Sequence, residues 1–137
     1  MFIEFQTKDD KAISYNVGNI VFIGEMKENV SVMFDDNTHV IFPDEYVAVV
    51  KKLIGLSRTV EPSAYVQFTT KKEERIAFPV RRIFYVLAQE HTTAIMFNDG
   101  TRIEVVEDYE SVMRRIYVKI DVAVTVDNSI LAEEIKS

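Results

Sequence analysis

Apolar and polar positions alternate along most of the chain, in short runs that polar turn residues separate. The runs ISYNV and IAFPV have the period of two that is typical of half-buried strands. The longer apolar runs IVFIGEM and IFYVLAQ predict more deeply buried strands. Asp36-Asn37 and Asp99-Gly100 each follow a further run of β-formers and predict hairpin turns, because Asn and Gly accept a positive φ. The pattern therefore predicts a chain built mainly of antiparallel hairpins.

Two other segments have the apolar spacing of a helix. They are DEYVAVVKKLIG, which starts at Asp44, and EDYESVMRRIYV, which starts at Glu107. Each opens with acidic residues and carries a pair of basic residues toward its other end, as the helix macrodipole favours. Gly55 is predicted to end the first helix.

A constant offset of 63 residues relates the two halves of this pattern. Aligning residues 2–54 with residues 65–117 gives 12 identities in 53 gapless pairs, among them Phe34 with Phe97 and Asp36 with Asp99. Self-similarity at a fixed spacing is the signature of a repeated structural unit. We infer a tandem duplication with a first unit at 1–55, a linker at 56–63 and a second unit at 64–117. One such unit buries little apolar surface, so the two units are expected to share a core.

Beyond the second helix the repeat ends. The run VKIDVAVTV places apolar residues at every second position of 118–126, which predicts an extra strand. Residues 127–137 are predicted to form a short terminal helix or a tail. The predicted fold class is therefore α+β, with two small antiparallel β barrels or sheets, each closed by a short helix and related by a pseudo-two-fold axis. The extra strand 118–126 offers an edge for a homodimer.

The stretch IAFPVRRIFYV, together with TTAIMFNDGTRIEVVEDYESVMRRI, resembles the small FlbD/SwrD flagellar and swarming proteins. The same stretch is similar to half of a LytTR DNA-binding domain, which runs strand, strand, hairpin, strand, helix. Both resemblances cover about 45 residues of each unit. They imply a small β module with no catalytic role, and the second implies DNA binding through basic and polar loop residues.

Composition and charge exclude several classes of function. The chain has no Cys and four Gly, and it lacks the motifs of phosphate-binding loops, nucleophile elbows and zinc proteases. The two histidines, His39 and His91, fall at different positions of the repeat, so we expect no metal site and no cofactor. No signal peptide pattern or membrane-length apolar run is present, which favours a cytoplasmic protein without membrane contact. We expect no enzyme activity.

The basic residues differ between the two units. Residues 1–63 carry 6 basic and 10 acidic side chains, whereas residues 64–117 carry 8 of each. Arginine suits anion recognition because its fork binds phosphate or carboxylate bidentately. The candidate anion or nucleic-acid face consists of Lys71, Lys72, Arg75, Arg81, Arg82 and Arg102. Two alternatives stay open: these residues serve only solubility, or they contact the acidic first unit within the chain or across a dimer.

Two functions follow from these observations. The first is a small regulatory protein, such as a phage-type modulator, that binds a protein partner through its acidic first unit or an exposed strand edge. The second is a nucleic-acid or nucleotide-binding regulator that uses the arginine face. The formal charge of -6 favours the first, because it opposes long-range attraction to nucleic acid.

Overall fold

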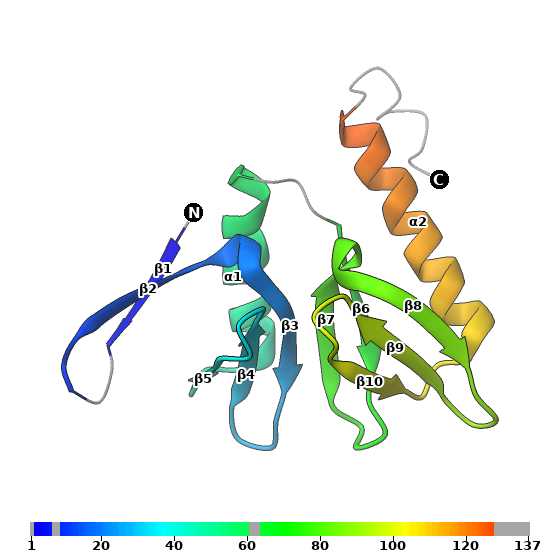
Figure 1. Cartoon of the computed structure of the whole chain (residues 1–137), viewed down its shortest axis with the longest axis horizontal. Helices are drawn as coiled ribbons and strands as arrows, with labels where there is room; N and C mark the ends of the chain where they lie inside the picture. Colours follow the sequence, from blue (N-terminus) through cyan, green and yellow to red (C-terminus); the bar gives the residue numbers. More distant parts are fainter. Residues whose placement is uncertain (1, 7–8, 61–63, 128–137) are drawn as a thin grey trace.

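A computed structural model of the chain describes residues 2–6, 9–60 and 64–127, which form ten strands and two α-helices (Figure 1). The first half comprises β1 (Phe2–Gln6), β2 (Ala12–Asn16), the 3-10 helix η1 (Val17–Asn19), β3 (Ile20–Glu25), β4 (Val30–Phe34), β5 (His39–Phe42) and α1 (Tyr46–Val60). The second half comprises β6 (Tyr65–Thr69), β7 (Arg75–Pro79), η2 (Val80–Arg82), β8 (Ile83–Ala88), β9 (Thr93–Phe97), β10 (Arg102–Val105) and α2 (Tyr109–Asp127).

The order of elements is the same in the two halves. Each element of the second half begins 63 residues after its counterpart in the first half, from β1 and β6 to α1 and α2. Even the irregularity between Ile20 and Phe22 in β3 recurs between Ile83 and Tyr85 in β8. The structure thus follows the sequence repeat. Its origin by duplication and the pseudo-two-fold axis stay predictions.

The described strands form three antiparallel sheets that stay open, so the predicted barrels are wrong and the alternative, sheets, is found. The strand orders are β1-β2, β5-β4-β3-β7-β6 and β10-β9-β8. In Figure 1 the β1-β2 hairpin lies at one end of the molecule, and the three-stranded sheet with α2 lies at the other. Among the described strands, no ladder joins the first hairpin of a unit to the other strands of the same unit. In the second unit, β6 and β7 instead extend the sheet of the first unit through β3.

The central sheet joins the two halves. Strand β7 pairs with β3, with Ile23 opposite Ala77 and Gly24 opposite Ile76. The first two strands of the second half therefore complete the sheet of the first half. A boundary in the sequence repeat is not a boundary between sheets.

The apolar core is interleaved in the same way. One buried cluster includes Phe34 and Leu53 from the first half together with Ala77 from the second. The other is built around Phe78 and Phe97 and includes Val21 and Met33 of the first half. Large apolar side chains at these positions lose nearly all contact with water, which is the main favourable term in folding. Each half thus relies on the other to bury its core.

The hairpin turns are those that the sequence predicts. Gly100 has a φ of 93°, and Asn37, at the same position of the repeat, has a φ of 68°. In each turn the preceding Phe accepts a backbone hydrogen bond from this residue, at 3.0 Å for Gly100 and 2.9 Å for Asn37. Glycine and asparagine adopt this left-handed conformation at low cost.

Helix α1 is longer than predicted. It continues through Gly55 to Val60, so residues 56–60 of the predicted linker are helical. Residues 61–63 lie outside the described residues. A glycine inside a helix costs only about 1 kcal/mol relative to alanine, so it does not end a helix that its neighbours otherwise favour.

The predicted strand at 118–126 is wrong, and with it the strand edge proposed for a homodimer. Helix α2 continues without interruption through this segment to Asp127. No Gly or Pro occurs between Tyr109 and Asp127, and extending an existing helix adds a hydrogen bond for each residue. Alternating β-branched residues therefore did not start a strand here. The rest of the predicted tail, 128–137, lies outside the described residues. Within those described, no helix is long and apolar enough to cross a membrane.

Candidate nucleic-acid interface

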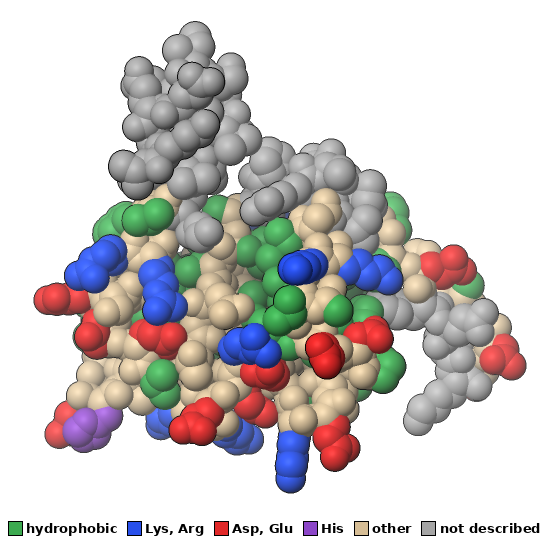
Figure 2. Space-filling model, turned by 180° about the vertical axis from the view of Figure 1, so that it is seen from behind, with side chains coloured by type: hydrophobic (Ala, Val, Ile, Leu, Met, Phe, Trp, Pro, Cys, Tyr) green, Lys and Arg blue, Asp and Glu red, His purple; other side chains and the backbone are tan. Residues whose placement is uncertain are grey.

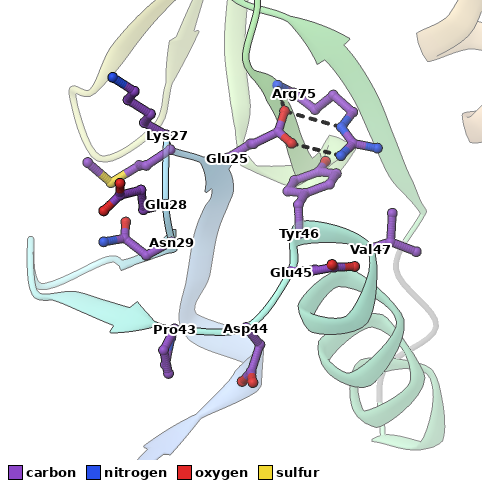
Figure 3. Close-up of a pocket in the computed structure, with 11 residues that line it drawn as sticks. Glu25, Lys27, Glu28, Asn29, Pro43, Asp44, Glu45, Tyr46, Val47 and Arg75 are labelled. Carbon is purple, nitrogen blue, oxygen red and sulfur yellow. Dashed lines mark hydrogen bonds and ion pairs between the residues drawn. The ribbon is translucent and has the colours of Figure 1, made fainter.

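Arg75 lies at the joint between the two halves rather than on an open face. Its guanidinium donates to both carboxylate oxygens of Glu25, at 3.2 Å from Nε and 2.7 Å from Nη2, and its backbone N–H donates to the same carboxylate at 2.9 Å. The guanidinium also lies 4.7 Å from the ring centroid of Tyr46 (Figure 3). These contacts join β3, β7 and α1. The hydrogen bonds from Arg75 lower the pKa of Glu25.

Replacing Glu25 with Gln is expected to reduce the free energy of unfolding by about 1–2 kcal/mol, since it removes a charge-assisted fork that solvent partly screens. The folded-state pKa of Glu25 is lowered, so its contribution is present above the unfolded-state pKa. The contribution is lost as the pH falls through the folded-state pKa. Denaturant titrations should therefore show a constant difference between wild type and Glu25→Gln at neutral pH, and a shrinking one below pH about 4.5.

The exposed Glu28, three residues along the chain, supplies a control for this experiment. Glu28→Gln should change the unfolding free energy by less than about 0.5 kcal/mol. A Glu25→Gln deficit that persists unchanged at acidic pH would contradict the account.

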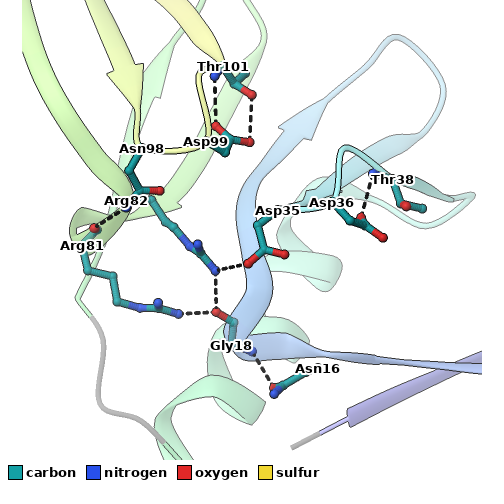
Figure 4. A network of polar contacts seen from close by, with 10 residues as sticks. All are labelled: Asn16, Gly18, Asp35, Asp36, Thr38, Arg81, Arg82, Asn98, Asp99 and Thr101. Atoms are coloured by element: carbon teal, nitrogen blue, oxygen red, sulfur yellow. Dashed lines mark hydrogen bonds and ion pairs between the residues drawn. The ribbon is translucent and has the colours of Figure 1, made fainter.

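Arg81 and Arg82 of η2 also face the first half. Both donate to the carbonyl oxygen of Gly18, at 2.9 Å from Arg82, and Arg82 pairs with Asp35 at 3.1 Å (Figure 4). Asn16 positions this carbonyl, because its Oδ1 accepts from the Gly18 N–H at 2.9 Å and fixes the turn of η1. The side chain of Arg82 is only 11% exposed, so it serves mainly to hold η2 against η1.

Lys71, Lys72 and Arg102 lie elsewhere. Lys71 and Lys72 occupy the exposed turn between β6 and β7, and Arg102 begins β10. An isolated bridge between Thr70 and Val105 brings this turn beside β10. Glu104 pairs with Lys71 and also, at 3.7 Å, with Arg102. Two of the three cations, Lys71 and Arg102, therefore share one carboxylate on the second half of the molecule, and Lys72 lies next to Lys71 in the turn.

The predicted face thus divides in two. Arg75, Arg81 and Arg82 make the contacts with the first half that one of the three sequence interpretations described. Lys71, Lys72 and Arg102 form a separate cluster, named here the turn cluster. The sequence could not separate these two groups. The partners of Arg81 and Arg82 in η2, for example, lie 47 to 64 residues away along the chain.

One polar residue that the sequence did not single out, Glu107, joins β6 of the central sheet to the segment that precedes α2. Both carboxylate oxygens of Glu107 accept from the Thr69 N–H at 3.0 Å, and Arg115 lies 3.5 Å away. Arg115 also donates to the carbonyl of Gln67 at 2.9 Å. The only sequence signal was the acidic start and basic end of the second helix, which indicated a dipole effect rather than a partner.

The face of the molecule seen in Figure 2 mixes both signs of charge. Figure 2 shows Lys and Arg side chains interspersed with Asp and Glu over one face, with green apolar side chains between them. A groove between α1 and α2 combines apolar and basic side chains. Its lining includes the apolar Val50, Ile54 and Val118 and the basic Arg114 and Arg115. Among the residues described, no group of three or more His, Cys, Asp or Glu could hold a metal ion.

Comparisons with known proteins place the fold. No protein-family model matches the chain, and no curated protein matches it significantly. Among solved structures, the chain is similar to a LytTr DNA-binding domain from Bacillus cereus, with a TM-score of 0.56 and 12% sequence identity over 85% of this chain and 95% of that one. The chain therefore has a LytTr-like fold of mixed α and β structure.

Proposed function

We propose that this protein is a DNA-binding regulator. The observation that carries the proposal is the likeness of fold to a LytTr DNA-binding domain over nearly its whole length. The exposed Lys71 and Lys72 in the turn between β6 and β7 also support the proposal, because polar and basic side chains on turns are suited to contacts with phosphates. Of the two functions that the sequence predicts, the likeness of fold supports the alternative better than the binding of a protein partner.

The turn cluster is the proposed contact with the phosphate backbone. Lys72 is exposed, and Lys71 and Arg102 share a single carboxylate, Glu104. Glu73 and Glu74 of the same turn balance the remaining charge, so the proposed contact depends on the three cations themselves and not on a net positive charge. A phosphate can replace the Glu104 carboxylate as the partner of Lys71 or Arg102, because both donate charge-assisted hydrogen bonds. Arg75 and Arg82 are proposed to act indirectly, by fixing the relative positions of the two halves.

A matched pair of double variants tests this assignment. Lys71→Ala/Lys72→Ala and Lys51→Ala/Lys52→Ala each remove two exposed lysines and change the formal charge from -6 to -8. If Lys71 and Lys72 contact phosphates, the first variant should make the negative slope of log affinity against log salt shallower, with a magnitude smaller by roughly 2. The second should leave the slope unchanged. Fluorescence anisotropy with a labelled duplex measures both slopes.

Equal losses in the two variants would show that only net charge matters and would remove the turn cluster from the interface. Failure of the wild type to bind any duplex would contradict DNA binding itself. The protein-partner function stays a prediction, although the strand edge at 118–126 on which it partly depended is helical.

A further inference from the structure

Among the described residues, two edge strands, β8 and β2, lack a pairing that the equivalent strands of the other half make. The equivalent strands are β3 and β7, which pair with each other in the central sheet. Strand β3 lies between β4 and β7, whereas its counterpart β8 pairs in the described chain with β9 alone. Strand β7 lies between β3 and β6, whereas its counterpart β2 pairs there with β1 alone. The molecule thus contains one complete β3-β7 junction and, at its two ends, the separate halves of an equivalent one.

Exposure of the side chains follows the same division. Val21 of β3 is fully buried against the second half, whereas Phe84, at the same position of β8, is 72% exposed. Leu87 of β8 is 45% exposed. On the other side of the junction, Ile76 of β7 is 4% exposed and its counterpart Ile13 of β2 is 39% exposed. Both open edges therefore carry large apolar side chains, which edge strands usually avoid.

We propose that these edges bind each other between two copies of the chain, with β2 of one copy pairing antiparallel with β8 of the next. The resulting sheet would have the order β10-β9-β8-β2-β1, which repeats the order β5-β4-β3-β7-β6 within the chain. The pairing of Ile23 with Ala77 and of Gly24 with Ile76 sets the register. In the new sheet Val86 would lie opposite Ser14, and Leu87 opposite Ile13.

The chemistry of this junction differs from that within the chain. The positions that correspond to Glu25 and Arg75 are Ala88 and Ala12, so the charged fork is missing. Leu87 and Ile13 instead supply a direct apolar pair across the strands. The contact is therefore reversible and depends on protein concentration. It is also heterologous, since each copy contributes a different edge and keeps its other edge open to a further copy.

Two charge substitutions at exposed positions give a test specific to this geometry. Leu87→Lys blocks the β8 edge and Ile13→Lys blocks the β2 edge, and each should weaken self-association by more than about tenfold. In an equimolar mixture, the Ile13→Lys copies keep an intact β8 edge and the Leu87→Lys copies keep an intact β2 edge. One pairing between the two variants therefore remains possible. Sedimentation velocity should show that each variant alone is monomeric and that the mixture forms a one-to-one dimer. Unfolding midpoints close to that of the wild type would show that both variants are folded.

A second test restores the missing fork. The double variant Ala12→Arg/Ala88→Glu places the Arg75 and Glu25 chemistry at the corresponding positions of the junction between copies. It should associate about tenfold more tightly than the wild type. The like-charge variant, Ala12→Glu/Ala88→Glu, places two carboxylates together and should dissociate the assembly.

Three results would overturn the proposal. The first is a wild type that stays monomeric at every concentration. The second is a mixture of Leu87→Lys and Ile13→Lys that forms no dimer. The third is a loss of association in Leu87→Lys with none in Ile13→Lys, which would indicate that β8 pairs with β8 of another copy. Because these measurements contain no DNA, their failure would leave the proposed function intact.

Discussion

Replacing Phe78 with Ala is expected to lower the free energy of unfolding by about 3–5 kcal/mol, the largest effect of any single truncation proposed for this chain. Phe78 is fully buried in the second core cluster. Its ring centroid lies 4.9 Å from that of Phe97 in an edge-on arrangement and 5.8 Å from that of Phe68. Removing the ring leaves a cavity that these neighbours cannot fill without leaving their own rotamers.

Chemical denaturation followed by circular dichroism measures this loss. Phe84→Ala is the matched control, because it removes the same atoms from a side chain that is 72% exposed. Its effect should stay within about 0.5 kcal/mol. Similar losses in the two variants would mean that the core does not lie where the structure places it.

Replacing Val21 with Asp is expected to destabilise the chain by about 3–5 kcal/mol, because it buries a carboxylate with no partner. Val21 belongs to the first half of the sequence but lies fully buried in the cluster of the second half. The substitution therefore tests directly whether the two halves share a core.

The repeat provides its own control for this variant. Phe84 occupies the corresponding position of β8 and is exposed, so Phe84→Asp should change stability by less than about 1 kcal/mol in dilute solution. If Val21→Asp were as mild as Phe84→Asp, the two halves would fold without the interleaved core. Unfolding in two separate steps for the wild type would lead to the same conclusion.

The sequence pattern predicted the turns, because their conformation depends on the residues in the turn itself. Gly100 and Asn37 adopt positive φ because the tight turn requires it, and both turns follow from the sequence. The two helices begin at Tyr46 and Tyr109, two residues after the predicted starts at Asp44 and Glu107, so the acidic pairs immediately precede the first helical residue. The ends of these helices differ more from the prediction, because continuation past Gly55 and through 118–126 depends on helix cooperativity rather than on the pattern of side chains.

The arrangement of the units could not be predicted from the sequence. Pairing of β3 with β7 joins residues more than 50 positions apart, and the alternation of a strand does not say which strand lies beside it. The six residues of the candidate face fall into two groups in the structure, and the sequence could not predict this because it does not show which strands lie side by side. Arg75 and Lys71 were both assigned to the candidate face from the sequence, yet only the fold shows that Arg75 binds Glu25 at the joint and that Lys71 pairs with Glu104.

The binding of duplex DNA as a function of salt tests the central claim most directly. With the turn cluster making three phosphate contacts, the slope of log affinity against log salt should be about -2.7, so affinity for a labelled duplex should fall roughly 40-fold between 50 and 200 mM salt. That result would support a DNA-binding regulator. The absence of binding at 50 mM salt, or binding that does not change with salt, would contradict it.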